Sequence, residues 1–449
     1  MMKRVKGLQT LALALCLAAC GGGSGGGTNA PAPAIGGFSA SAGVVNSGAT
    51  VTLSWSVSNA SKVLLQPGAI DVSSLSSYPV TPTATTTYTL QASSSGGSVQ
   101  ASTSVRVYSW SALGSALDGY LSSSSNPTSG AVAGYSFLVF NRSGTLYTRS
   151  GGNQSLSTVE MLASASKLPS SAAILTLVDQ GKLNLDTPIA TYLNNAGNPI
   201  TWPGDKALIT MRMLLAHTSG LPGLNNNQPG CLNQTTGTTL QQCAQSIADA
   251  TLVYQPGADF NYGGADYQVA GYVATLIAGA ANWQAFFNSA IAAPLGGIAS
   301  FSYGDASTVT NPRIAGGAMS DVADYATFLG MVQDGGMFNG TQVLSPSAIS
   351  VLTTNQIAGL PVAYTPFSSS TAPDYPGYGL GVFISAASLY PGSPGPEFSD
   401  PGLYGSTPWF DNGLNYGAVL LIDQDTQTGL DMWNAARPLI IQQLTGTAS

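Results

Sequence analysis

The stretch MLASASKLPSSAAILTLVDQGKLNLD, residues 161–186, places Lys167 three residues after Ser164 in surroundings that are mostly small or apolar. Residues three apart share one face of a helix. Burial among apolar neighbours lowers the pKa of a lysine, and the neutral amine can then take the proton of a nearby hydroxyl. The pattern predicts a serine nucleophile with a lysine partner. The alternative is a surface helix with a solvated lysine.

The composition of the chain indicates an exported protein of two domains. Its 449 residues are 44% hydrophobic and only 7% charged, and its formal net charge is −7. The length suits more than one domain. Because no cluster of Lys or Arg remains after the first few residues, the chain lacks the positive face that nucleic acids require, and we expect no nucleic-acid partner.

The N-terminus has the order of a bacterial export signal. Basic residues precede an apolar segment that ends in Leu-Ala-Ala-Cys20. Small residues before a cysteine resemble a lipobox, which predicts that residues 1–19 are removed and that Cys20 carries a lipid anchor. The anchor would hold the chain to the cell envelope, on the outer membrane. An ordinary signal peptide with an incidental cysteine is the alternative. Residues 20–36, rich in Gly, Ser and Pro, predict a tether.

Cysteine and histidine are scarce in the remainder of the chain. Cys231 and Cys243 form an even pair in an exported protein, which predicts a disulfide that closes a local loop. A single histidine and the lack of Cys-x-x-Cys argue against a metal site, and nothing indicates a cofactor. His217, that single histidine, follows an apolar helical pattern. We expect it to cap this helix and fix the next turn rather than to act as a base.

Residues 37–108 predict a small β-sandwich. Val51, Leu53 and Trp55 alternate with polar residues, as in a half-buried strand, and similar strands follow between turn residues. The segment resembles immunoglobulin-like modules of bacterial surface proteins, with Trp55 as a core residue, although it lacks the paired cysteines of antibody domains. We expect a spacer; a module that binds wall or polymer is the alternative.

Residues 109–449 predict an α+β domain. A helical pattern near residues 110–121 and a hairpin pattern in residues 135–151 open the domain. Helices and loops follow. Strand patterns in residues 378–384 and 415–423, and then a helix, close it. Strands at both ends with helices between them predict an antiparallel sheet assembled from both ends of the domain.

Blocks in a defined order resemble a known family. They are LASASKLPSSAAILTLVDQGKLNLDTPIATYL, ITMRMLLAHTSGLPG, YQPGADFNYGGADYQVAGYV, NPRIAGGAMSDVADYATFLGMVQDGG and YGLGVFI, within residues 115–445. Together they are similar to the serine hydrolases related to class C β-lactamases and D-Ala-D-Ala peptidases. The resemblance implies a β-lactamase-like fold and an acyl-enzyme mechanism.

The resemblance also implies roles for individual residues. Ser164 would be the acylated nucleophile, Lys167 its base partner and Tyr262 the phenol that relays the proton. We expect the neighbouring ammonium to lower the pKa of Tyr262, although a packed aromatic is the alternative for this residue. Which of Lys167 and Tyr262 is the formal base stays open, because their titrations are coupled. The backbone N–H groups of Ser164 and Leu403 would form the oxyanion hole.

Two departures from the family pattern bear on the substrate. The motif Tyr-x-Asn is Tyr-Gly-Gly here, from Tyr262 to Gly264, so the asparagine that holds a substrate amide is missing. The motif Lys-Thr-Gly or His-Thr-Gly has Asp-Pro-Gly, from Asp400 to Gly402, as its best candidate. No cation is then left to hold a substrate carboxylate, and an acid at Asp400 would repel one.

These departures favour a neutral substrate. Gly264, Gly402, Tyr404 and Trp409 are predicted to line its cleft. The sequence therefore predicts an exported esterase, with amides as further substrates, that acts on a small or polymeric ester through an acyl-enzyme. One alternative is a D-Ala-D-Ala carboxypeptidase or β-lactamase of the same fold. Another is a non-catalytic surface binding protein. The sequence gives no indication of the oligomeric state.

Overall fold

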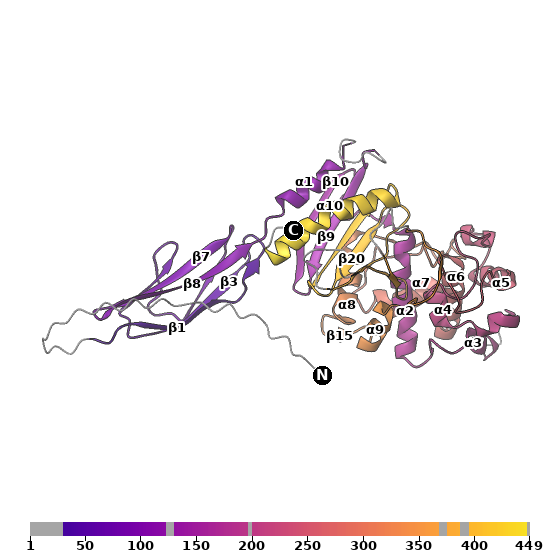
Figure 1. Ribbon diagram of the computed structural model, residues 1–449, viewed down its shortest axis with the longest axis horizontal. Helices are drawn as coiled ribbons and strands as arrows, with labels where there is room; N and C mark the ends of the chain where they lie inside the picture. Colours follow the sequence, from indigo (N-terminus) through magenta and orange to yellow (C-terminus); the bar gives the residue numbers. More distant parts are fainter. Residues whose placement is uncertain (1–29, 123–129, 196–199, 368–374, 387–394, 447–449) are drawn as a thin grey trace. The chain divides into compact units, whose positions relative to one another are not determined.

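The computed structural model describes residues 30–122, 130–195, 200–367, 375–386 and 395–446. The chain divides into two compact units, Met1–Tyr108 and Ser109–Ser449 (Figure 1). The predicted signal peptide, Cys20 and most of the predicted tether lie outside the described residues.

The N-terminal unit consists of two sheets that share one core. One sheet has the strand order β1-β3-β6, and the other has the order β2-β8-β7-β4-β5. Its strands are β1 (Ala34–Ala40), β2 (Val44–Val45), β3 (Val51–Ser58), β4 (Lys62–Gln66), β5 (Ile70–Asp71), β6 (Ser77–Val80), β7 (Thr86–Ser94) and β8 (Gly97–Val107). The first strand begins at Ala34, so the end of the predicted tether, residues 20–36, overlaps this strand. Trp55 lies in the shared core, and its indole N–H donates to the Leu75 carbonyl over 3.0 Å.

The C-terminal unit is built on a seven-stranded antiparallel sheet with the order β10-β9-β21-β20-β19-β18-β17. Its strands are β9 (Gly134–Asn141), β10 (Gly144–Gly152), β17 (Gly377–Tyr378), β18 (Phe383–Ile384), β19 (Glu397–Ser399), β20 (Thr407–Asp411) and β21 (Tyr416–Ile422). Because β9 pairs with β21, the two ends of the unit meet in the sheet. The predicted α+β class and the predicted sheet are confirmed.

Shorter strands and helices complete this unit. The strands are β11 (Glu160–Met161), β12 (Phe260–Asn261), β13 (Met319–Ser320), β14 (Met337–Phe338), β15 (Thr341–Gln342) and β16 (Val362–Tyr364). The α-helices are α1 (Ser111–Gly119), α2 (Lys167–Asp179), α3 (Ile189–Asn195), α4 (Met211–Leu215), α5 (Leu240–Asp249), α6 (Ala265–Ala278), α7 (Trp283–Phe287), α8 (Val322–Gln333), α9 (Pro346–Thr353) and α10 (Thr426–Thr445). Other short helical segments are η1 (Ala163–Ser166), η2 (Gly204–Leu208), η3 (Gly230–Asn233) and η4 (Asn288–Ala292).

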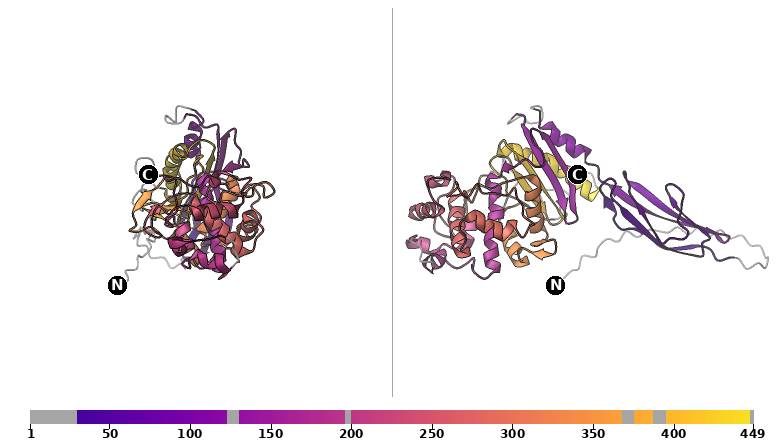
Figure 2. Two further views of the ribbon diagram at one scale, coloured as in Figure 1. Left: turned by 90° about the vertical axis from the view of Figure 1, so that its right-hand side faces the viewer. Right: turned by 180° about the vertical axis from the view of Figure 1, so that it is seen from behind.

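Both faces of the central sheet are covered at β21, which explains why this strand is buried and apolar along its whole length. Side chains alternate across a strand. Val419 and Leu421 of β21 join the core that contains α8, whereas Leu420 and Ile422 join the core that contains α10. Figure 2 shows α1 and α10 along one face of the sheet and the remaining helices beyond the other.

The segment YGLGVFI forms two strands rather than the single strand that its sequence predicts. The strands β17 and β18 pair as a hairpin, and Gly381 between them has φ 86°. A side chain at Gly381 would come within 2.8 Å of the Lys167 carbonyl oxygen. This turn therefore packs directly against the start of α2, and only glycine allows that approach.

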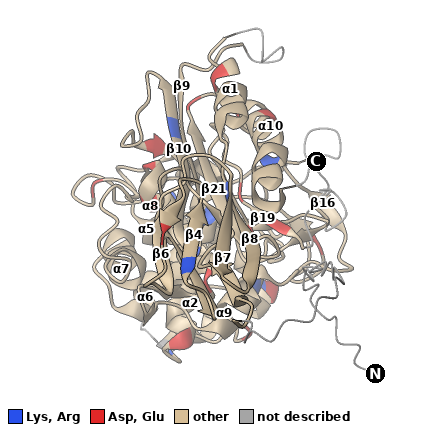
Figure 3. Ribbon diagram, turned by 90° about the vertical axis from the view of Figure 1, so that its left-hand side faces the viewer, with Lys and Arg blue, Asp and Glu red and all other residues tan. Residues whose placement is uncertain are grey.

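Charged residues are few and scattered along the ribbon (Figure 3). Over the described ranges, no helix combines the length and hydropathy needed to cross a membrane. In the same part of the chain, His, Cys, Asp and Glu side chains do not gather in a group of three or more that could hold a metal ion.

Candidate active site

Ser164, Lys167 and Tyr262 line one cleft of the C-terminal unit, with a cavity volume of about 460 Å³. Its walls come from η1 and the start of α2, the loop that precedes α6, the chain around η3, and loops near residues 313–316, 364–367 and 401–404. Of the residues predicted to bind substrate, Gly264 and Tyr404 also lie here. The fold therefore brings together segments that lie far apart in the sequence.

Ser164 lies in the 3-10 turn η1, just before α2, rather than within the helix itself. Ala163, the preceding residue, has φ 45°, a left-handed conformation that is unfavourable for a residue with a side chain. Such strain is concentrated at functional sites, where surrounding structure holds it in place. The turn leaves Ser164 half-buried at the cleft while the residues around it are buried.

Lys167 is almost completely buried, with 2% of its surface exposed. Its Nζ atom donates to the Ala315 carbonyl oxygen over 3.0 Å and lies 4.5 Å from the centre of the Tyr262 ring. Burial lowers the pKa of Lys167 to about 8; the Asp400 carboxylate opposes this shift and the Arg313 guanidinium adds to it. The lowered pKa that the apolar sequence predicts is therefore present.

Tyr262 has a raised pKa, so the expectation of a lowered one is wrong. Burial is the main cause of the shift to well above 10, and the Asp400 carboxylate adds to it, whereas the Ser164 hydroxyl lowers the pKa. The ammonium of Lys167 lies over the ring face. A cation in that position interacts with the ring electrons. It does not offset the cost of a buried phenolate.

His217 supports Tyr262 from behind. It follows α4 with φ 56°, and its N–H donates to the Leu214 carbonyl over 3.3 Å, which is the helix end and turn that the sequence predicts. Its buried ring lies 4.6 Å from the Tyr262 ring, and Nδ1 lies 3.0 Å from an Asp266 carboxylate oxygen. Burial, with a contribution from Lys167, holds the pKa of His217 well below 6.5. A neutral imidazole therefore packs against the phenol of Tyr262, a contact that no local pattern in the sequence predicts.

Asp400 does not face the cleft, which corrects its expected effect on a substrate. Its side chain is fully buried, and Oδ2 accepts the N–H of Leu168 over 3.3 Å at the start of α2. A carboxylate is favourable at a helix N-terminus. Burial raises the pKa of Asp400 to about 8, against the opposing effect of Lys167. Asp400 thus acts on the lysine from inside the protein.

Gly402 and Trp409 are not among the residues that line the cleft. Trp409 is fully buried, and its indole N–H donates to the Tyr416 hydroxyl over 3.2 Å, because β20 is covered on both faces. The prediction that Trp409 contacts substrate is therefore wrong. Gly402 has a different function from the one predicted: a Cβ atom there would lie 2.2 Å from the Leu162 carbonyl oxygen. Its missing side chain lets this loop approach the turn that contains Ser164.

The two backbone groups expected to form the oxyanion hole flank this approach. Leu403 follows Gly402, lines the cleft and is 62% exposed. Among the hydrogen bonds of the described residues, neither the Ser164 N–H nor the Leu403 N–H donates to another group. Free N–H groups at and near a serine hydroxyl are the type of donor that can stabilise an oxyanion.

Arg313 and Gln228 also line the cleft, although the sequence alone does not predict either of them as a site residue. Gln228 Oε1 accepts the N–H of Gly264 over 3.0 Å, and a Cβ atom at Gly264 would lie 3.5 Å from that oxygen. A side-chain amide therefore lies beside the position where related enzymes carry the motif asparagine. Neither residue has a local sequence signal, because each reaches the site from a separate loop.

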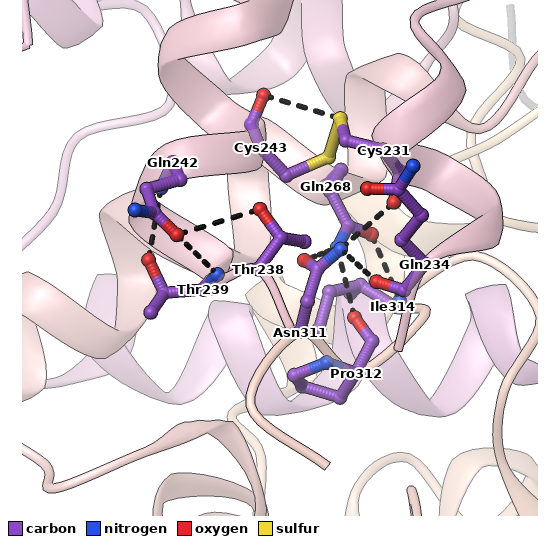
Figure 4. The surroundings of a disulfide bond; sticks show 10 residues. All are labelled: Cys231, Gln234, Thr238, Thr239, Gln242, Cys243, Gln268, Asn311, Pro312 and Ile314. Carbon is purple, nitrogen blue, oxygen red and sulfur yellow. Dashed lines mark hydrogen bonds between the residues drawn. A yellow bond between two sulfur atoms is a disulfide. The ribbon is translucent and has the colours of Figure 1, made fainter. Parts of the chain in front are cut away.

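Cys231 and Cys243 form a disulfide that joins η3 to α5, with their Cα atoms 5.4 Å apart (Figure 4). The same part of the chain contributes Leu232 and Asn233 to the cleft. The disulfide thus closes a loop that forms one wall of the site.

Comparisons with known proteins agree with this geometry. The family model described as Beta-lactamase matches residues 118–439. Protein Rv1367c of Mycobacterium tuberculosis (strain ATCC 25618 / H37Rv) is 27% identical over 315 residues, which is 59% of this chain and 76% of the relative. A putative beta-lactamase from Bacteroides dorei DSM 17855 is similar in structure, with a TM-score of 0.60 and 23% identity over 76% of this chain and 100% of the other.

A second solved structure has a similar fold. It is EstCE1, described as a hydrolase with promiscuous acyltransferase activity, with a TM-score of 0.58 and 19% identity over 72% of this chain and 98% of the other. Fold, cleft and family match together define a serine hydrolase. The chain belongs to the β-lactamase family.

Proposed function

We propose that this protein hydrolyses an ester through an acyl-enzyme on Ser164, and that it acts in the cell envelope, held by a lipid on Cys20. The buried amine of Lys167, with its pKa lowered to about 8, in the same cleft as Ser164, carries the catalytic part of the proposal. The anchor rests on the Leu-Ala-Ala-Cys sequence alone.

The mechanism begins with proton transfer from the Ser164 hydroxyl. With a pKa of about 8, roughly a tenth of the Lys167 amines are neutral at pH 7. The serine oxygen attacks the ester carbonyl as its proton passes to Lys167, with Tyr262 as a relay. The N–H groups of Ser164 and Leu403 hold the resulting oxyanion. Because burial disfavours the phenolate of Tyr262, we assign the base to Lys167.

The acyl-enzyme then forms and breaks. The bond between the carbonyl carbon and the leaving oxygen breaks, and the proton taken from Ser164 passes to the departing alcohol. Water next attacks the acyl-serine, gives one proton to the same base and releases the acid. Ser164 regains its proton in this step, so the enzyme returns to its starting state.

The cleft supports an ester with an apolar body. Leu224, Leu232 and Phe367 line it, and the position of the third motif carries no cation that faces the substrate. The fold of EstCE1, which is described as a hydrolase with acyltransferase activity, is consistent with an acyl-enzyme here. The group next to the third motif would therefore be uncharged, as the sequence predicts, and amides remain further substrates.

A peptidase or β-lactamase activity is the second candidate, because two observations favour it. Gln228 offers an amide beside Gly264, and Arg313 offers a cation in the cleft. A penicillin or a peptide ending in D-Ala presents both an amide and a carboxylate. The sequence argued against these substrates because the third motif offers no cation for their carboxylate. Arg313 is such a cation, so this argument is weaker in the structure.

Covalent labelling and turnover separate the candidates. A fluorophosphonate probe should label the wild-type protein and leave Ser164→Ala unlabelled, because the probe reacts with an activated serine. Hydrolysis of p-nitrophenyl esters without labelling by fluorescent penicillin would support the esterase. Penicillin labelling together with release of D-Ala would support the second candidate. If the probe labels neither protein, the nucleophile assignment is wrong.

A further inference from the structure

Arg313 is an exposed cation in the catalytic cleft that lacks an acidic partner among the described residues. Other arginines of this unit do have such partners: Arg142 with Asp334, Arg149 with Asp118, Arg212 with Asp186 and Arg437 with Glu397. Placing a guanidinium in the cleft without a counter-ion leaves its hydrogen-bond donors available to a ligand.

The backbone on both sides of Arg313 is held by one buried side chain. Gln268 of α6 donates to the Pro312 carbonyl over 2.9 Å and accepts the N–H of Ile314 over 3.2 Å. The carbonyl of Arg313 itself accepts the N–H groups of Gly316 and Gly317 over 3.1 and 2.6 Å. The arginine is therefore presented by a fixed turn.

This turn is tied to the disulfide loop. Gln268 also donates to Asn311 Oδ1 over 2.6 Å, and the amide of Asn311 donates to the carbonyls of Cys231 and Gln234 over 2.9 and 2.7 Å (Figure 4). Buried polar groups that satisfy one another in this way specify a single local geometry. Because its backbone is held in this way, the arginine side chain starts from a fixed point at the cleft.

The charged side chains that line the cleft are all positive. Lys167 and Arg313 are its charged side chains, and the described lining contains no Asp or Glu, although the chain as a whole has a net charge of −7. Leu224 and Leu403, both exposed, form apolar parts of the lining. A ligand that matches these features combines an apolar body with an anionic group.

We propose that Arg313 binds a carboxylate of the substrate, so that the enzyme prefers esters whose acyl part ends in an acid. The guanidinium can form two parallel hydrogen bonds with a carboxylate. This inference rests on the proposed ester hydrolysis at Ser164. It narrows the predicted neutral substrate to one that is uncharged beside the third motif and carries an anionic group where it meets Arg313.

A matched pair of esters tests this preference. Mono-p-nitrophenyl glutarate ends in a carboxylate, and the p-nitrophenyl ester of glutaramic acid has the same shape with a neutral amide. We expect kcat/KM of the wild-type protein to be about 10-fold higher for the carboxylate, because hydrogen bonds to charged groups are stronger than those between neutral groups. In Arg313→Gln this ratio should fall to about one, and in Arg313→Lys it should take an intermediate value.

Comparing the two esters within each variant separates recognition of the carboxylate from a general loss of activity, because a general loss lowers kcat/KM for both esters equally. Arg142→Gln is the matched control, because Arg142 is an exposed arginine paired with Asp334 outside the cleft, and its ratio should equal that of wild type. A wild-type ratio near one, or an unchanged ratio in Arg313→Gln, would overturn the inference. Loss of the ratio in Arg142→Gln as well would also count against it.

Binding without turnover keeps this test independent of the proposed reaction. In Ser164→Ala, calorimetry should show tighter binding of the glutarate ester than of the glutaramate ester, and Arg313→Gln in that background should remove the difference. If wild type hydrolyses neither ester but the binding difference remains, the proposed ester hydrolysis fails and the anion site stands. Equal binding of the two esters would refute the anion site.

Discussion

Asp400 and Arg313 both act on Lys167, with opposite sign and from different environments. Asp400 is buried at the start of α2 and raises the lysine pKa, whereas Arg313 is exposed in the cleft and lowers it. The sequence alone predicts that the acid meets the substrate and that the site holds no cation for it. The difference teaches that the position of a charge relative to the cleft, rather than its place in a motif, decides what it acts on.

The largest expected effect on ester hydrolysis comes from Lys167, the amine whose pKa both Asp400 and Arg313 influence. Lys167→Ala removes the proposed base, and the loss of kcat/KM for a p-nitrophenyl ester should be about 10²–10⁴-fold. Circular dichroism and the melting temperature report whether the variant folds. A folded Lys167→Ala protein with a near-normal rate would show that neither Asp400 nor Arg313 acts through this amine.

Asp400→Asn should shift the pH dependence to lower pH. The carboxylate raises the pKa of Lys167, so its loss lowers that pKa below about 8 and leaves more neutral amine at a given pH. The acid limb of the kcat/KM profile should therefore move down in pH. Asparagine keeps an oxygen that can accept the Leu168 N–H. An acid limb that moves up would mean that Asp400 acts on a different group.

Arg313→Gln should shift the acid limb of the kcat/KM profile to higher pH, and this shift should be smaller than the opposite shift in Asp400→Asn. The guanidinium lowers the pKa of Lys167, so its removal raises that pKa and moves the acid limb up. Because Arg313 is exposed, solvent and salt screen its charge. The profile, measured with a neutral ester, should differ from wild type at low salt and approach it at high salt. A difference that persists at high salt would contradict this screening.

The smallest expected effect on ester turnover comes from the disulfide. Replacing Cys231 and Cys243 by serine frees the loop that holds Asn311 and, through it, the turn of Arg313. We expect a stability loss of about 2–3 kcal/mol, a lower melting temperature and a smaller preference for the glutarate ester. The shift of the acid limb should be no larger than in Arg313→Gln, because the contact of Asp400 with the start of α2 does not involve the disulfide loop. An unchanged melting temperature would show that the disulfide contributes little.

Much of the fold follows from local patterns in the sequence. The hairpin of β9 and β10 and the helices α1 and α10 follow from hydrophobic periodicity, which local contacts suffice to specify. YGLGVFI illustrates the limit. Its apolar residues predict one strand, but the close approach of α2 at Gly381 turns it into a hairpin. Trp409 shows the same limit: its sequence position predicts a cleft residue, but the sheet is covered on both faces and buries it.

The sequence by itself determined the class of chemistry, because Ser164, Lys167 and Tyr262 stand in recognisable local patterns with a suitable apolar context. Only the tertiary structure decided which other charges meet them. Arg313 and Gln228 reach the cleft, while Asp400 and His217 lie behind it, through contacts between segments far apart in the chain. The pKa of a group depends on its burial and on the distance to neighbouring charges, and both are set by how these segments pack.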